Sequence, residues 1–432
     1  MAPEVLEKSV DKMGIAPGST RKRTLSKRGV LWLGQTCNLR CYFCYFLNRI
    51  ADTEHPEHAF MSLEKSKEIC HTLRHFYGNT GIDIQGGEPT IYPDILELIS
   101  YCRDIGLHPT LITNGLVLAK PEKLAEFKEA GIRDFLVSLH GIGDVHDEVV
   151  CRKGSYVKII QAIENMVEQD VPFRFNCTMS KPVVELLPEI AKKAIHYGAN
   201  AVNFIAFNPF EDQETGIRTH DNVARYSEIK PKLTEAMDIL DDAGIECNVR
   251  YLPICMAEER HRKNFYNFQQ LPYDHHEWDY QSWMWTGLQP QRMSGGDLVP
   301  PFRIGPFADR VFRGNAEMIR DNYKRRPFRG KIRFTGQHFL CQVAQTVQGK
   351  DAIYREEAKK RARLELKYQY HEACGRCAMR NICDGFHGDY ADLHGTSEAT
   401  PIDEGARPVD DPLHYICEQE KVVEAEDARW AL

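Results

Sequence analysis

The sequence predicts an α/β fold in which helices cover a parallel sheet. The main observation is a rhythm between residues 29 and 244, where short apolar runs alternate with longer amphipathic segments. That alternation is typical of repeated strand–helix units around a parallel sheet. A second observation is the length of 432 residues, which suggests two or three domains at about 150 residues each. The third is a pair of cysteine clusters, one just after the first apolar run and one near the C-terminus.

Six strands are expected along this part of the chain. Each is a run rich in Val, Ile, Leu or Phe, and together they cover residues 30–34, 82–85, 110–113, 135–139, 173–177 and 202–206. A further strand is suggested at residues 247–252. The pattern fits a doubly wound sheet or a full or partial βα barrel, and in these folds ligands bind at the C-terminal ends of the strands. Functional residues are therefore expected just after each strand.

The helices between these strands carry their own start and stop signals. They are expected at residues 62–78, 94–106, 121–131, 155–167, 182–198 and 226–242. Ser62 is a suitable capping residue, Pro121 suits a first helical turn, and Gly131 and Gly198 suit helix ends. These signals agree with the spacing of the apolar residues, which supports the α/β prediction.

The composition is that of a globular protein and excludes several classes. Hydrophobic residues make up 42% and charged residues 27%, close to the averages for soluble domains. The formal net charge is -7, so no basic excess marks a nucleic-acid binder. No apolar stretch of about 18 residues is present to span a membrane, and the N-terminus lacks the apolar core of a secretory signal. A cytoplasmic protein with no nucleic-acid and no membrane partner is expected.

Four segments are expected along the chain. Residues 1–28 are polar and basic and predict a flexible arm. Residues 29–253 hold the strand–helix units. Residues 254–340 are rich in aromatic residues, above all at 273–285, a stretch that can line a substrate pocket or belong to a core. Residues 341–432 hold a basic helical stretch at 354–367 and the second cysteine cluster.

The first cysteine cluster follows the first expected strand. Cys37, Cys41 and Cys44 have the spacing CxxxCxxC, and in a reducing compartment metal or redox roles are commoner than disulfides. Soft thiolates select iron-sulfur clusters, zinc or copper(I). A structural zinc needs a fourth ligand, which His55 or His58 can supply. A 4Fe-4S cluster on three cysteines instead leaves one iron open to a small ligand. Buried free thiols are the remaining interpretation.

This cluster, with the aromatic Phe43 before Cys44, resembles the CxxxCxΦC signature of the radical S-adenosylmethionine (SAM) superfamily. The resemblance implies a partial (β/α)6 barrel with the signature on the loop after its first strand. It also implies that Cys37, Cys41 and Cys44 bind three irons of a 4Fe-4S cluster, while SAM binds the fourth iron through its amino and carboxylate groups.

The loops after the later strands agree with this resemblance. The segment 86–89 reads GGEP, similar to the family motif that holds the amino group of SAM. Its glycines allow close approach of the backbone, and a carboxylate accepts hydrogen bonds from an ammonium. Segments after the third and fourth strands resemble the TNG and VSLDG segments that line the SAM pocket in the family. The cofactor-binding residues implied are Phe43, Gly86, Gly87, Glu88, Thr113, Asn114, Ser138 and Arg152.

Three positions near these motifs have less defined roles. His140 stands where the VSLDG segment of the family has Asp. Arg152 suits bidentate pairing with the carboxylate of SAM, or it is a surface arginine. Asn176, taken to follow the fifth strand, is a further candidate for the pocket.

The second cysteine cluster lies near the C-terminus. Cys374, Cys377 and Cys383 form CxxCx5C, and Cys417 follows. Four thiolates suit a zinc ribbon or a 4Fe-4S cluster. Behind the radical SAM motifs, the run resembles the C-terminal half of a SPASM domain. The resemblance implies a small C-terminal iron-sulfur domain with one auxiliary 4Fe-4S cluster on these four cysteines.

The other candidate ligands have weaker support. His387 stands where the SPASM run has a further cysteine, and either His387 or Cys341 is a reserve ligand. The remaining cysteines mostly fall on apolar faces and are expected to be core residues. They are Cys70, Cys102, Cys151, Cys177, Cys247, Cys255 and Cys341.

The resemblance also implies an activity. A radical SAM enzyme, as an oxidoreductase or a transferase or mutase that functionalises C–H bonds, cleaves SAM to a 5'-deoxyadenosyl radical that abstracts hydrogen from its substrate. The auxiliary cluster would accept an electron or bind the substrate, and a donor such as flavodoxin or ferredoxin would supply electrons. A small-molecule substrate is expected, because 36 residues before Cys37 are too few for the leader-binding domain of many peptide-modifying relatives. A peptide maturase of the SPASM type and a non-catalytic iron-sulfur or zinc protein are the alternatives.

Overall fold

The computed structural model describes residues 28–44, 46–54, 58–75, 79–207, 218–270 and 367–419, and the isolated positions 339, 343, 347, 359, 362 and 363. The N-terminal arm up to residue 27, the aromatic stretch at 273–285 and most of the basic stretch at 354–367 lie outside the described residues. The same holds for His55, for Cys341 and for the side chain of Cys417.

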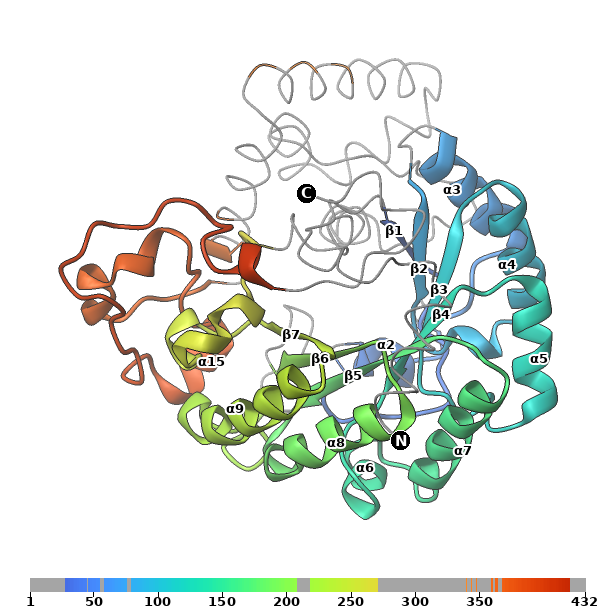
Figure 1. Cartoon of the computed structure of the whole chain (residues 1–432). Coiled ribbons are helices and arrows are strands. Elements are labelled where there is room, and N and C mark those ends of the chain that lie inside the picture. Colours follow the sequence, from blue (N-terminus) through green and yellow to red (C-terminus); the bar gives the residue numbers. More distant parts are fainter. Residues whose placement is uncertain are drawn as a thin grey trace.

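Eight parallel strands form one curved sheet in the order β1 to β8, which gives an open half-barrel (Figure 1). They are β1 (Arg28–Trp32), β2 (Gly81–Gln85), β3 (His108–Thr113), β4 (Asp134–Ser138), β5 (Phe173–Met179), β6 (Ala201–Ala206), β7 (Glu246–Arg250) and β8 (Phe265–Tyr266). The predicted α/β fold and its six strands are confirmed, with ends displaced by at most two residues. The suggested further strand is β7. The short β8 was not expected, because two residues are too few to leave a pattern.

Helices cover the outer face of this sheet (Figure 1). They are α3 (Leu63–His75), α4 (Ile95–Asp104), α5 (Pro121–Ala130), α6 (Asp144–Val149), α7 (Ser155–Glu168), α8 (Leu187–Tyr197) and α9 (Tyr226–Asp242). The short α2 (Leu47–Ala51) follows the cysteine loop after β1, and α15 (Gly388–His394) lies in the C-terminal part. Gly131 and Gly198 end α5 and α8 with φ of 99° and 72°, a left-handed conformation that favours glycine. The helix expected at 182–198 is divided, because residues Lys181–Leu186 form a separate 3-10 helix. The short α2 and α6 were not expected.

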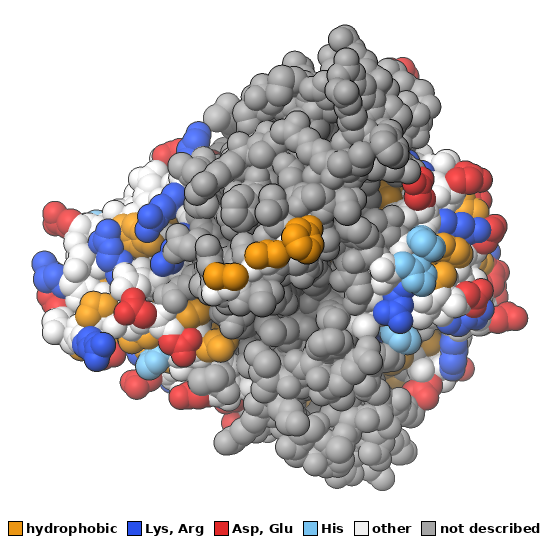
Figure 2. Space-filling view, turned by 90° about the horizontal axis from the view of Figure 1, so that it is seen from above, with side chains coloured by type: hydrophobic (Ala, Val, Ile, Leu, Met, Phe, Trp, Pro, Cys, Tyr) orange, Lys and Arg blue, Asp and Glu red, His pale blue; other side chains and the backbone are white. Residues whose placement is uncertain are grey.

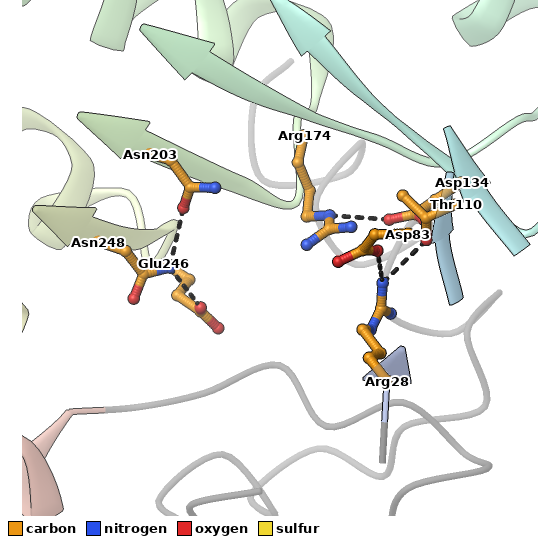
Figure 3. Close-up of polar contacts among 8 residues, drawn as sticks. All are labelled: Arg28, Asp83, Thr110, Asp134, Arg174, Asn203, Glu246 and Asn248. Atoms are coloured by element: carbon orange, nitrogen blue, oxygen red, sulfur yellow. Dashed lines mark hydrogen bonds and ion pairs between the residues drawn. The ribbon is translucent and has the colours of Figure 1, made fainter. Parts of the chain in front are cut away.

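Buried polar side chains line the strands near their N-terminal ends (Figure 3). The Arg28 guanidinium donates to Asp83 and Thr110 at 2.8 and 2.9 Å, and Arg174 donates to Asp134 at 2.8 Å. Asn248 donates to Asn203 and Glu246 on the far side of the half-barrel. Buried charges need such partners. This end of the half-barrel is therefore occupied by side chains that bind one another, and a ligand site is expected at the opposite end.

Residues 367–419 pack against the last strands and α9 (Figure 1). The Tyr226 ring at the start of α9 stacks on the Tyr390 ring of α15 with centroids 3.6 Å apart, and the Tyr226 N–H donates to the Tyr390 hydroxyl at 2.9 Å. Buried Asp384 accepts from the N–H of Phe268, which follows β8, at 2.7 Å. The second cysteine cluster is thereby held at the edge of the half-barrel where the sheet ends.

The described surface carries charges of both signs. On the face shown in Figure 2, Lys and Arg are interspersed with Asp and Glu over the described regions, in keeping with a formal net charge of -7. None of the described helices is both long and apolar enough to cross a membrane.

Candidate cofactor and metal sites

A cavity lies at the C-terminal ends of the strands, where the sequence predicts ligands. It is lined by the loop after β1 and by residues at the ends of β2 to β6. The cavity brings together all but one of the residues predicted for the first site, namely Cys37, Cys41, Phe43, Cys44, Gly86, Gly87, Glu88, Thr113, Asn114 and Ser138. Arg152 lies outside this lining.

The loop that carries the three cysteines is fastened to the loop after β2. The Gly87 N–H donates to the Gly34 carbonyl at 2.8 Å, and the Glu88 N–H donates to the Thr36 carbonyl at 2.9 Å. A Cβ atom on Gly87 would lie 2.1 Å from the Thr36 oxygen, and one on Gly86 would lie 2.2 Å from the Gly34 oxygen. Both glycines are therefore required by the close approach of two backbone segments. The GGEP segment positions the cysteine loop in addition to facing the cavity.

Glu88 is buried and binds both neighbouring loops. Its Oε1 atom accepts from the N–H and hydroxyl of Thr90 at 3.0 and 2.6 Å and from the Thr113 hydroxyl at 2.6 Å. Its Oε2 atom accepts from the Asn114 N–H at 2.8 Å. Burial raises the pKa of Glu88, while these donors act in the opposite direction. Because a carboxylate oxygen can accept more than one hydrogen bond, Oε2 retains the capacity to accept a further donor from the cavity.

The three thiols share one poorly solvated patch. Burial raises the pKa of Cys37 to about 12, with Glu88 adding to the shift, and raises that of Cys44 to about 11. The pKa of Cys41 is also raised by burial and by the two neighbouring thiols. Thiols bind metals as thiolates, so metal binding at this loop releases their protons and its positive charge offsets the repulsion among them.

Phe43 and His140 pack edge to face beside the cysteines, with ring centroids 4.5 Å apart. The His140 Nδ1 atom accepts from the Thr178 N–H at 3.0 Å, which assigns the ring proton to Nε2. Burial lowers the pKa of His140 to about 3, so the ring is neutral near pH 7. His140, which stands where the VSLDG segment has Asp, therefore gives the cavity a neutral side chain at this position.

Asn176 contributes a polar atom to the cavity. The residue lies within β5 and lines the cavity, which corrects the expectation that it follows the strand. Its Oδ1 atom is buried and has no hydrogen-bond partner among the described residues. An unsatisfied buried acceptor costs about 1–3 kcal/mol. A ligand with a hydrogen-bond donor at this point would remove that cost.

Arg152 is exposed and contacts the cysteine loop from outside the cavity. Its Nη1 atom donates to the Asn38 carbonyl at 2.9 Å, and Asn114 donates to the Asn38 side chain at 2.7 Å. Arg152 thus supports the loop, and its pairing with a SAM carboxylate stays a prediction. Sequence reasoning did not identify Phe207 and Tyr251, which also line the cavity. Both directly follow a strand, β6 and β7, which is the signal that could have found them.

A second, smaller cavity holds the C-terminal cysteines. Cys374, Cys377 and Cys383 line it together with Cys255, which follows β7 and was expected to be a core residue. The backbone of Cys417 lies in the 3-10 helix Ile416–Glu418, but its side chain lies outside the described residues.

Two histidines considered as ligands, His387 and His58, are not in these linings. His387 is buried at the start of α15, where its Nδ1 atom accepts from the Asp389 N–H at 3.3 Å, and it lies outside the lining of the second cavity. His58, a zinc ligand in one interpretation of the first cluster, lies outside the lining of the first cavity. Within the described ranges, no three His, Cys, Asp or Glu side chains are grouped to hold a single metal ion.

Part of the region that forms the first cavity is similar to known proteins. Residues 33–181 match the model of the Radical SAM superfamily. The Fe-coproporphyrin III synthase of Methanosarcina barkeri is 30% identical over 162 residues, which are 37% of this chain and 39% of that protein. The AdoMet-dependent heme synthase of the same organism is 29% identical over 188 residues, 43% of this chain and 52% of that protein.

Other relatives cover a similar share of the chain. The PqqA peptide cyclase of Rhodopseudomonas palustris is 28% identical over 172 residues, 40% of this chain and 44% of that protein. The chain thus spans about half the length, or less, of these curated relatives. Among solved structures, Streptococcus suis SuiB bound to S-adenosylmethionine is 17% identical, with 52% of this chain and 51% of that chain covered and a TM-score of 0.42.

Proposed function

We propose, on the premise that residues 33–181 are a radical SAM domain, that this chain is an enzyme that cleaves SAM reductively and abstracts hydrogen from a small-molecule substrate. When bound, a 4Fe-4S cluster and SAM supply a 5'-deoxyadenosyl radical that removes hydrogen from an unactivated carbon. The observation that carries the proposal is that one cavity is lined by the three thiols and by the GGEP loop.

Different residues of the first cavity would bind the iron-sulfur cluster and SAM. Cys37, Cys41 and Cys44 would hold three irons, and the described lining contains no fourth cysteine, which leaves one iron position for SAM. Glu88 would accept a hydrogen bond from the ammonium of SAM through Oε2, which now accepts from the Asn114 N–H. Asn176 would accept a further hydrogen bond through its Oδ1 atom, for which the described part of the chain provides no donor.

The proposal extends to the rest of the chain. Residues 29–253 would be the catalytic unit, residues 254–340 would contribute substrate contacts, and residues 341–432 would hold an auxiliary 4Fe-4S cluster on Cys374, Cys377, Cys383 and a fourth ligand. An auxiliary cluster there would accept an electron from the product radical or bind the substrate. A cytoplasmic one-electron donor such as flavodoxin or ferredoxin would supply the reducing electron.

The substrate class is argued from the relatives. Two of them are named as synthases of Fe-coproporphyrin III and of heme, which are small molecules, and this favours a small-molecule substrate. The PqqA peptide cyclase favours a second candidate function, the modification of a peptide. Deuterium transfer from labelled candidate substrates into 5'-deoxyadenosine would separate the two.

The test of the proposal is 5'-deoxyadenosine formation by the anaerobically reconstituted, dithionite-reduced protein, measured by chromatography. We expect formation by the native chain and none by a Cys37→Ala variant. Equal formation by both proteins would contradict the proposal, and so would no formation by a native chain that carries a complete first cluster and is supplied with candidate substrates of both classes.

A further inference from the structure

Four cysteines line the second cavity, and one of them comes from the barrel. Cys255 lies in the 3-10 helix Ile254–Met256 after β7, whereas Cys374, Cys377 and Cys383 lie in the C-terminal part. All four are half-buried and line the same cavity. Cys255, Cys377 and Cys383 also pack against one apolar cluster, to which both chain segments contribute. The fold thus brings a distant cysteine beside the CxxCx5C run.

Backbone N–H groups point at the sulfur atoms of this group. The Ile402 N–H donates to the Cys377 Sγ atom at 3.3 Å, and the backbone of Thr400 donates to the Cys255 thiol. Residues 400–402 therefore donate backbone hydrogen bonds to thiols from both parts of the chain. Hydrogen bonds to sulfur favour the thiolate and tune the potential of iron-sulfur clusters.

Cys383 joins the two chain segments in the same way. Its Sγ atom accepts from the Gly385 N–H at 3.4 Å and also from the backbone of Ile254. Ile254 directly precedes Cys255. The short helix after β7 is therefore connected to the CxxCx5C run by a hydrogen bond from its backbone to the Cys383 sulfur atom. This arrangement suits a metal centre whose ligands come from both segments.

Cysteines of the core lack these features. Cys177 is fully buried, and burial is the sole cause that raises its pKa. Cys70 and Cys102 are buried in the core with their sulfur atoms 3.6 Å apart. Cys255 differs because it lines the second cavity together with Cys374, Cys377 and Cys383. Its surroundings are those of a ligand group.

We infer that Cys255 is the fourth thiolate ligand of the second metal centre, with Cys374, Cys377 and Cys383, in place of Cys417. The inference rests on the proposed function only in requiring a metal centre in the second cavity. Four thiols bind as thiolates and release four protons to solvent, with no change in oxidation state of the sulfur. Tyr251, which follows β7 shortly before Cys255, lines the first cavity, so this ligand would connect the second centre through a short segment to the lining of the first cavity.

The test uses the full chain with Cys37, Cys41 and Cys44 replaced by Ala, so that only the second centre contributes metal. Iron, sulfide and zinc are measured per chain after anaerobic reconstitution. We expect about four irons in this background, loss of most of them on adding Cys255→Ala, and retention on adding Cys417→Ala or Cys341→Ala. Cys247→Ala on β7 is the control for disturbance of the same strand.

The outcomes separate the inference from the proposed function. Iron retained with Cys255→Ala and lost with Cys417→Ala would overturn the inference and leave the auxiliary centre in place. A background that binds neither iron nor zinc would overturn the inference together with the auxiliary centre, while SAM cleavage by the native chain would still support the first site.

Alkylation of the native protein gives a second test that needs no variant. Iodoacetamide labelling is followed by peptide mass spectrometry before and after the metal is removed with a chelator. We expect Cys255 to be protected in the metal-loaded protein and alkylated after chelation, with labelling of Cys417 unchanged. Equal labelling of Cys255 in both states would contradict its role as a ligand.

Discussion

The two cysteine-lined cavities are built in different ways. The first takes its three thiols from one loop after β1 and adds polar acceptors, Glu88 and Asn176, that face the same space. The second takes three thiols from the C-terminal run and one, Cys255, from the end of β7. Its sulfur atoms receive backbone N–H donors, as at Cys377. A site with three thiols and spare acceptors suits a centre open to a ligand, and a site with four thiols suits a closed one.

The two sites also differ in how closely other atoms pack around their glycines. Gly86 and Gly87 are fixed by carbonyl oxygens 2.2 and 2.1 Å from where a Cβ would lie. For Gly375, inside the CxxC of the second site, the one described side chain within 4 Å of such a Cβ is Arg380, at 3.9 Å. The first loop therefore depends on close backbone packing at its two glycines, whereas Gly375 has space for a methyl group among the described residues.

The largest effect on 5'-deoxyadenosine formation is expected when a thiol of the first site is removed and the result is compared with removal of a thiol from the second site. Cys37→Ala should lower 5'-deoxyadenosine formation by at least about 100-fold, because an incomplete site loses the metal. Cys374→Ala should leave formation within about threefold, because the two sites are separate. Chromatography of the nucleoside and iron analysis measure both effects, with Cys177→Ala as the control. An equal loss in Cys37→Ala and Cys374→Ala would show that the cavities act as one site.

A smaller effect is expected from the matched pair Gly87→Ala and Gly375→Ala. The added methyl group at Gly87 would force the cysteine loop away from Thr36, and a displacement of about 1 Å lowers rates about 100-fold. Gly375→Ala should leave nucleoside formation and the iron content of the second site unchanged. Comparable activity in the two variants would mean that the GGEP loop does not position the cysteine loop.

Asn176→Ala tests whether the first cavity is shaped for a ligand. Loss of one hydrogen bond to SAM should raise its Kd about 5–10-fold, equivalent to about 1–1.4 kcal/mol. The free energy of unfolding of the SAM-free protein should not fall, because the Asn176 Oδ1 atom has no hydrogen-bond partner among the residues that the structure describes. Calorimetric titration and chemical denaturation measure the two quantities. An unchanged Kd with reduced stability would assign Asn176 a structural role only.

The smallest effect is expected at Arg152. Arg152→Ala removes an exposed hydrogen bond to the Asn38 carbonyl, which is worth about 0.5–1 kcal/mol, so the Kd for SAM should rise about twofold to fivefold. Arg152→Lys should recover part of the loss. An increase in Kd well above tenfold in both variants, seen by equilibrium dialysis, would instead indicate bidentate pairing with the carboxylate of SAM.

Local pattern was enough to predict most of the half-barrel and the first cavity. The strands could be predicted because each is a short apolar run, and Cys37, Cys41 and Cys44 because their spacing within one loop is itself the signal. The position of Glu88 could be predicted because it follows the end of β2, where ligand-binding residues are expected. Its bonds to Thr90 and Asn114 could not be predicted, because they depend on how adjacent loops pack.

Features that depend on distant parts of the chain were missed. Cys255 stands alone in the sequence, so no spacing marks it, and only the packing of the segment after β7 against the C-terminal part brings it to Cys374. Asn176 was taken to follow the fifth strand, although the expected strand at 173–177 already contained it and β5 continues to Met179. The two residues of β8 gain their conformation from pairing with β7.

The central claim is that one centre is open and the other closed. The most direct measurement is the electron paramagnetic resonance spectrum of the reduced native protein with and without SAM, compared with Cys37→Ala and Cys255→Ala. We predict two cluster signals, of which SAM shifts only the one that Cys37→Ala removes, while Cys255→Ala removes the other. A SAM-induced shift of the signal that survives in Cys37→Ala, or of neither signal, would contradict the account.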